Sequence, residues 1–300
     1  MNYIEKDDFY SEVLKRAIEL RDDLDFTLQE VVKNNDCTLT ALVIRKQDEE
    51  MGAMVYLNPL YDDFTHGISI DSILNTIFDS YADMPAFKRK LVLETYDFNS
   101  VKDKLCLKLI NFDRNQEYLK DKVFKRFLGN LAVTCYYKPF SDCSITITEG
   151  LLHTWKITED ELFDIARANT QKQLCFQFDT IGTAINKAFE ESVGESDLPI
   201  NLEEDDIEMY VVSNDTYEYG ATALLYEEVL EQAGDFLKSD FYVLPSSIHE
   251  LLVLPAKDNM DIIGLKEIVS YINQTEVPEC DYLSDTVYLY SRADKTLTAV

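Results

Sequence analysis

The stretch of sequence that decides the fold reads FTLQEVVKNNDCTLTALVIR and spans residues 26–45. Its two ends, 26–32 and 39–45, are rich in β-branched and aliphatic side chains, as β-strands are. Between them lies Asn-Asn-Asp at 34–36, whose side chains tolerate positive φ and hydrogen-bond to their own backbone. The stretch therefore predicts an antiparallel β-hairpin.

Helical patterns flank this hairpin. An apolar stripe predicts a helix over 8–21, whose buried face would consist of Phe9, Val13, Leu14, Ile18 and Leu20. A short strand is expected at 53–57, followed by a turn. The next pattern predicts a helix over 70–81 with Ser69 as its N-cap.

The rest of the chain alternates irregularly between strand and helix patterns. Thr158 and Glu161 form a capping box, in which each side chain satisfies the other's backbone amide, and this box opens a predicted helix. Other helices are expected at 180–192, 226–237 and 264–272. Strands are expected at 104–112, 127–137, 144–148, 207–213, 241–244, 249–254, 286–290 and 296–300. This order predicts an α+β fold with mixed or antiparallel sheets, packed helices and two subdomains.

One stretch has the composition of a linker. Residues 194–206, GESDLPINLEEDD, hold six acidic residues, no basic one, a glycine and a proline. The sequence therefore predicts an N-terminal α+β domain over 1–193, an acidic linker over 194–206 and an acidic α+β domain over 207–300.

The charge balance is strongly acidic. The chain has 300 residues, with 28 Lys and Arg against 56 Asp and Glu, and a formal net charge of −28. A field of this sign repels phosphate backbones and anionic membranes, and it attracts cations and basic protein surfaces. With 46% hydrophobic residues, the chain is also unlike a disordered acidic tail.

A basic stretch interrupts the acidity. Residues 86–126 hold eleven basic and six acidic side chains, a net charge of +5, interleaved with aromatic residues. These aromatic rings could stack on nucleic-acid bases, or they could be core positions beside solvated lysines. The basic stretch could also dock on the acidic C-terminal part of the chain.

The sequence lacks the motifs that are typical of several classes of function. The nine glycines are never within ten residues of each other, so neither a Walker loop nor a dinucleotide-binding loop is present. The six cysteines show no close pair of the kind that binds zinc. Because these motifs are missing, we expect no cofactor. We also expect a cytoplasmic protein, because neither a signal peptide nor a membrane-length apolar run occurs.

Two small groups of residues are weak candidates for chemistry. Ser247 and His249 could serve a hydrolase as nucleophile and base, or could simply form a turn and strand. Asp62 and Asp63, with His66 nearby, could hold a hard cation such as Mg²⁺, or form a solvated turn.

The amino-acid sequence resembles an uncharacterised domain-of-unknown-function family, the 5688 type, found in gut anaerobic bacteria. The matching pieces include Lys33-Asn34-Asn35, Tyr56-Leu57-Asn58, Lys108-Leu109-Ile110-Asn111, Leu244-Pro245-Ser246-Ser247-Ile248-His249-Glu250 and Leu283-Ser284-Asp285-Thr286-Val287-Tyr288. The resemblance implies a bacterial cytosolic protein from accessory or mobile-element gene neighbourhoods. It carries no activity, cofactor or catalytic residue.

The leading hypothesis is a non-enzymatic acidic protein that engages a basic partner surface. Its most specific form is a nucleic-acid mimic that inhibits a nucleic-acid-handling protein in a mobile-element or anti-defence context. The expected contact residues are Glu203, Glu204, Asp205, Asp206, Glu227, Glu228 and Glu231. The alternatives are a cytosolic hydrolase or metal-assisted enzyme centred on Ser247 and His249, and an assembly component with salt-sensitive self-association.

Overall fold

The computed structural model describes residues 4–47, 52–82, 94–140, 143–173, 175–180, 183, 209–245, 247–257 and 260–300. The chain divides into two compact units, Met1–Ser100 and Val101–Val300. The sequence predicts its boundary at 194–206 instead, a segment outside the described residues. The strands on either side of that segment are hydrogen-bonded neighbours in one sheet, so both belong to the second unit.

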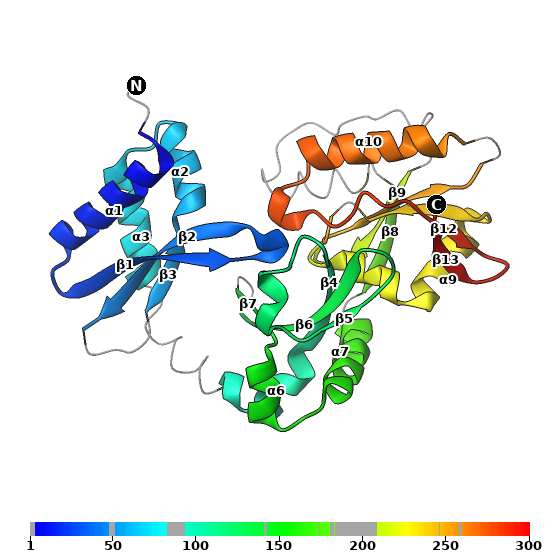
Figure 1. Ribbon diagram of the computed structural model, residues 1–300, viewed down its shortest axis with the longest axis horizontal. Coiled ribbons are helices and arrows are strands. Elements are labelled where there is room, and N and C mark those ends of the chain that lie inside the picture. Colours follow the sequence, from blue (N-terminus) through cyan, green and yellow to red (C-terminus); the bar gives the residue numbers. More distant parts are fainter. Residues whose placement is uncertain are drawn as a thin grey trace. The chain divides into compact units, whose positions relative to one another are not determined.

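The first unit contains a three-stranded antiparallel sheet in the order β1-β2-β3 (Figure 1). The strands are β1 (Leu24–Val32), β2 (Thr38–Lys46) and β3 (Ala53–Tyr56). The predicted hairpin is confirmed, because β1 and β2 pair throughout their length. The turn between them has positive φ at Asn35 and Asp36, as their side chains permit.

Three helices pack on this sheet, α1 (Lys6–Leu20), α2 (Leu57–Thr65) and α3 (Ile70–Ala82). Their buried side chains form one core with alternate residues of β1 and β2, such as Phe26, Leu42 and Ile44. The predicted Ser69 cap is confirmed, since its Oγ accepts a hydrogen bond from Ser72 N at 3.2 Å.

Two expectations for the first unit are wrong. Ile18 and Leu20 are 51% and 60% exposed, because α1 buries the face that carries Phe9, Val13 and Ala17. The strand predicted at 53–57 is confirmed as β3, but the turn predicted after it is wrong. Helix α2 begins at Leu57 and continues through that turn.

The second unit contains two antiparallel sheets. The smaller has the order β4-β6-β5, with β7 also paired to β6. Its strands are β4 (Leu105–Asn111), β5 (Phe124–Arg126), β6 (Leu131–Phe140) and β7 (Cys143–Thr146). Short helix α5 (Phe98–Val101) precedes β4, and helices α6 (Glu149–Trp155) and α7 (Glu159–Gln173) follow β7. The capping box is confirmed by reciprocal hydrogen bonds between Thr158 and Glu161.

The larger sheet has the order β13-β12-β10-β11-β9-β8. Its strands are β8 (Phe176–Thr180), β9 (Tyr210–Asn214), β10 (Phe241–Leu244), β11 (Leu251–Pro255), β12 (Tyr288–Ser291) and β13 (Thr296–Ala299). Along the chain, helix α9 (Glu227–Leu237) lies between β9 and β10, and helix α10 (Ile262–Thr275) lies between β11 and β12. Strand β8 was not expected, and most of the predicted helix 180–192 lies outside the described residues. The antiparallel sheets with packed helices confirm the α+β class.

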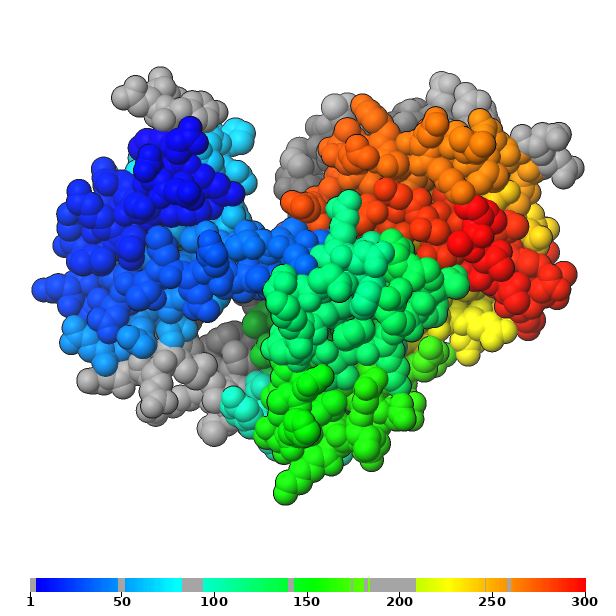
Figure 2. All heavy atoms as spheres, viewed as in Figure 1, coloured from blue at the N-terminus to red at the C-terminus, as the bar shows by residue number. Residues whose placement is uncertain are grey.

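Hydrogen bonds join the two sheets of the second unit. Asn111 Nδ2 donates to Leu283 O at 2.8 Å, and Ser284 Oγ donates to Asn130 Oδ1 at 3.0 Å. In Figure 2 the green atoms near residue 120 accordingly lie against the orange and red atoms of the C-terminal segment. Among the described residues, no helix has the length and apolar character that crossing a membrane requires.

The buried hydroxyl of Thr170 anchors α7 on β4, because it accepts a hydrogen bond from Leu107 N and donates one to Ala166 O, both at 2.7 Å. We expect Thr170→Val to lower the free energy of unfolding by roughly 1–3 kcal/mol, since a buried amide loses its acceptor. Urea denaturation measures this.

Thr134, equally buried on β6, is the matched control. Its Oγ1 has no hydrogen-bond partner among the described residues. Thr134→Val should therefore leave stability unchanged or raise it. Equal losses for the two variants would contradict the anchoring role of Thr170.

Candidate functional site

A group of polar and aromatic side chains meets between the two sheets of the second unit. It consists of Lys108 on β4, Tyr219 after β9, His249 and Glu250 before β11, and Asp281 before β12; we call it the polar centre. The polar centre is built around the ring of Tyr219.

The loop that carries Tyr219 is held by Asn214, which is fully buried at the end of β9. Asn214 Oδ1 accepts hydrogen bonds from Thr216 N and Glu218 N, each at 3.1 Å, and Asn214 Nδ2 donates to Glu218 O at 2.7 Å. Tyr217 and Tyr219 both have positive φ, 49° and 56°. Such backbone is strained for tyrosine and persists only where its surroundings enforce it.

Glycine is required at position 220 for close packing. A Cβ atom there would lie 2.5 Å from His249 O and 2.9 Å from Asn214 N, and it would also collide with Ser213 Oγ. That serine hydroxyl donates to His249 O at 2.7 Å. The close approach of three backbone segments thus fixes the position of Tyr219 relative to His249.

Three side chains contact the Tyr219 ring. The Nζ atom of Lys108 lies 4.5 Å from the ring centroid, which is cation–π distance. The imidazole of His249 stacks at 5.7 Å with an interplanar angle of 16°, and Tyr136 meets the ring edge-on at 4.9 Å. Beside the ring, Lys138 forms an ion pair with Glu218.

The imidazole of His249 has partners at both nitrogens. Nδ1 accepts a hydrogen bond from Tyr219 N, and Nε2 faces Asp281 Oδ1, each at 3.4 Å. The hydroxyl of Ser247 instead accepts a hydrogen bond from the backbone amide of His249 at 3.0 Å. The hydroxyl and imidazole thus face different partners, and the hydrolase hypothesis stays a prediction.

The sequence places His249 in a strand, whereas β11 begins only at Leu251. The alternation of faces along a strand therefore does not govern Ser247, His249 and Glu250. The backbone of this segment instead forms an antiparallel bridge between Ser247 and Tyr282. Burial raises the pKa of Glu250 above its ordinary value, and the opposing effects of His249 and Ser247 are smaller.

The weak metal candidates lie on a helix rather than in a loop. Asp62 and Asp63 belong to α2 and His66 is its C-cap. His66 Nδ1 contacts the backbone carbonyl of Asp62 at 2.7 Å, so the imidazole closes the helix end. Among the described residues, no group of three or more His, Cys, Asp or Glu side chains could hold a metal ion.

The basic stretch places several cations on aromatic rings of this chain. The guanidinium of Arg126 lies 3.7 Å from the Phe112 ring centroid, and that of Arg114 lies 3.8 Å from Tyr282. Phe112 itself packs against the core around Ile110. The described part of the stretch, residues 94–126, therefore contacts the C-terminal segment through Arg114.

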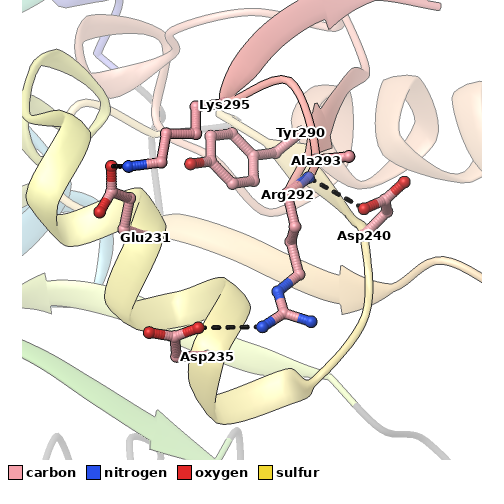
Figure 3. A pocket seen from close by; sticks show the side chains of 7 residues that line it. All are labelled: Glu231, Asp235, Asp240, Tyr290, Arg292, Ala293 and Lys295. Atoms are coloured by element: carbon pink, nitrogen blue, oxygen red, sulfur yellow. Dashed lines mark hydrogen bonds and ion pairs between the residues drawn. The ribbon is translucent and has the colours of Figure 1, made fainter.

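The described carboxylates expected to contact a partner lie on α9, with Asp235 on the same face of that helix. Glu227 and Glu228 are exposed, and no ion pair involves them among the residues that the structure describes. Glu231 pairs with Lys295 at 2.5 Å, and Asp235 pairs with Arg292 at 2.9 Å (Figure 3). The other expected residues, Glu203, Glu204, Asp205 and Asp206, lie outside the described residues.

Sequence reasoning missed Lys108, Tyr219 and Asp281. One signal was available, because Lys108 interrupts the otherwise apolar LCLKLI and a buried lysine needs a compensating partner. For Tyr219 and Asp281 no local signal exists, since their partners lie far away in the sequence.

Comparison with known proteins finds one family. Its model, described as a family of unknown function (DUF5688), matches residues 6–292. No curated protein and no solved structure matches the chain.

The close packing at Gly220 gives a stability prediction. Gly220→Ala should lower the free energy of unfolding by roughly 1–3 kcal/mol, because the added methyl meets backbone atoms that cannot move independently. Gly150→Ala is the control, since a Cβ at 150 would make only an ordinary contact with Thr148. Thermal unfolding that ranks Gly220→Ala as no worse than Gly150→Ala would show that the loop is not packed as described.

The raised pKa of Glu250 gives a pH prediction. The folded state binds the proton of the Glu250 carboxyl more tightly than the unfolded chain does. The contribution of this proton to stability is therefore fully present below the ordinary pKa of glutamate, and it is lost as pH rises through the pKa of Glu250 in the folded state. Glu250→Gln should therefore be more stable than the parent protein near neutral pH and equally stable at acid pH. Urea denaturation from pH 4 to 8 measures the difference, with the exposed Glu267→Gln as control; a pH-independent difference would refute it.

Proposed function

Since the chain belongs to a family of unknown function, we propose its role from charge and surface geometry: it is an acidic interaction protein that binds a basic partner through α9. The supporting observation is the placement of four carboxylates on one face of that helix. At 100° per residue, positions 227, 228, 231 and 235 fall within one quarter to one third of the helix circumference. We call them the α9 acidic face: Glu227, Glu228, Glu231 and Asp235.

Two members of the α9 acidic face favour an external cation. Glu227 and Glu228 lie in the first turn of α9, are exposed, and make no ion pair with any described residue. A carboxylate at a helix N-terminus interacts favourably with the helix dipole. These two side chains can therefore meet a lysine or arginine of a partner without first losing an internal partner.

The charge of the whole chain supports fast encounter with such a partner. A formal net charge of −28 attracts basic surfaces over distances of about 10 Å at moderate salt. Complementary charge mainly accelerates association and makes binding sensitive to salt. The more specific hypothesis of a nucleic-acid mimic stays a prediction, as do the enzyme and assembly alternatives.

The test compares two pairs of carboxylates in equivalent positions. Asp7 and Asp8 are exposed in the first turn of α1, as Glu227 and Glu228 are in the first turn of α9. A fluorescent nona-arginine peptide serves as the basic probe, and anisotropy gives its affinity at low and high salt. We expect Glu227→Gln with Glu228→Gln to weaken binding about tenfold at low salt, because two charge-assisted contacts are lost.

The double variant Asp7→Asn with Asp8→Asn removes the same net charge from the other unit. It should weaken binding less than about threefold, since only the long-range field changes. Equal losses in the two double variants would mean that affinity follows net charge alone, and α9 would not be the binding surface.

A further inference from the structure

A hollow of about 630 Å³ opens between α9 and the turn that joins β12 to β13. Its lining combines carboxylates, cations and one tyrosine: Glu231, Asp235, Asp240, Tyr290, Arg292, Ala293 and Lys295. Figure 3 shows the carboxylates of Glu231 and Asp235 on α9 facing the cations of the turn. The hollow thus adjoins the exposed carboxylates of the α9 acidic face.

A buried hydroxyl in this hollow lacks a partner. Tyr290 is 1% exposed, and its hydroxyl makes no hydrogen bond with any described residue. In Figure 3 the hydroxyl end of Tyr290 points toward the pair formed by Glu231 and Lys295. A buried hydroxyl without a partner is destabilising, and a ligand group that hydrogen-bonds to it would remove this cost.

The two cations of the hollow are held differently. Arg292 packs across Gly234, where even a Cβ would lie 3.0 Å from its Cγ, and its guanidinium bonds to Asp235. Its backbone amide also donates to Asp240 Oδ1 at 2.9 Å. Among the residues that the structure describes, Lys295 forms an ion pair with Glu231 alone, and its side chain is 54% exposed. Such exposed pairs contribute little, so Lys295 is the cation that an incoming group can displace.

We propose that this hollow binds the guanidinium group of an arginine side chain, which replaces Lys295 on Glu231 and hydrogen-bonds to the hydroxyl of Tyr290. The inference rests on the proposed function and assigns it a specific subsite. A guanidinium has five N–H donors in one plane, so it can serve a carboxylate and a hydroxyl together. An ammonium is a point charge without this geometry. Lys295 thereby acts as an internal stand-in for the partner's cation.

The carboxylates of the hollow suit this ligand in number and spacing. Glu231 and Asp235 are four residues apart on α9, so they are neighbours one turn apart on its surface. With Arg292 retained and Lys295 displaced, three carboxylates face one resident cation. The vacated position therefore favours a second cation rather than an anion.

The experiment compares nona-arginine with nona-lysine on the full chain by fluorescence anisotropy at low salt. In the parent protein we expect nona-arginine to bind more tightly by about tenfold, because only the guanidinium makes the paired contacts. Glu231→Gln should reduce this preference by about fivefold. Glu228→Gln, on the same helix but outside the hollow, should weaken both peptides alike and leave the preference unchanged.

Two further variants test the displaced cation and the hydroxyl. Lys295→Met should raise nona-arginine affinity more than Lys266→Met, which removes the same charge from an exposed position on α10. Tyr290→Phe should lower the arginine preference without lowering thermal stability, since the hydroxyl has no partner to lose.

An arginine preference that survives Glu231→Gln, or that falls equally in Glu228→Gln, overturns the guanidinium subsite. So does a loss of stability in Tyr290→Phe with the preference intact. The proposed function is judged separately by the α9 and α1 double variants. If those differ while the peptide preference is insensitive to Glu231, binding through α9 stands and the subsite alone is rejected.

Discussion

The buried amide of Asn111 ties strand β4 to the C-terminal segment of the second unit. It is 2% exposed at the end of β4; its Nδ2 donates to Leu283 O, and its Oδ1 accepts from Arg114 N at 2.9 Å. The bond to Leu283 joins residues 172 positions apart and so closes a very long loop. Because a buried amide that loses its partner is costly, this bond strongly favours one arrangement of the two sheets. It sets the C-terminal segment beside β4.

The polar centre follows from that arrangement. With Leu283 fixed, the segment before it places Asp281 opposite the imidazole of His249, and Tyr282 beneath the guanidinium of Arg114. Lys108, on the same strand as Asn111, then reaches the ring of Tyr219. Residues from four separate parts of the chain thus converge, and the strained backbone of Tyr219 is held by contacts that its own loop could not provide alone.

The distribution of charge has a structural explanation as well. Several cations are engaged within the chain: Arg114 and Arg126 stack on aromatic rings, and Lys138 pairs with Glu218. One face of helix α9 carries both exposed carboxylates and carboxylates that are paired with cations. Its first turn presents exposed carboxylates, while Glu231 and Asp235 meet the cations of the β12–β13 turn. The carboxylates of this strongly acidic chain are therefore divided between exposed and paired positions. The net charge alone does not describe this arrangement, on which complementarity to a partner surface depends.

The sequence by itself determined the features whose partners lie within a few residues, namely the hairpin turn at 34–36 and the capping box of Thr158 and Glu161. It also determined the net charge, which is a sum over residues. Only the tertiary structure decided that β8 pairs with β9, that α1 buries Ala17 rather than Ile18, and which carboxylates of α9 are neutralised. The pairs on Glu231 and Asp235 join residues 64 and 57 positions apart, so they exist only once β12 and β13 have folded against α9. Local patterns carry no information about such contacts, because their energy depends on distances that the whole fold creates.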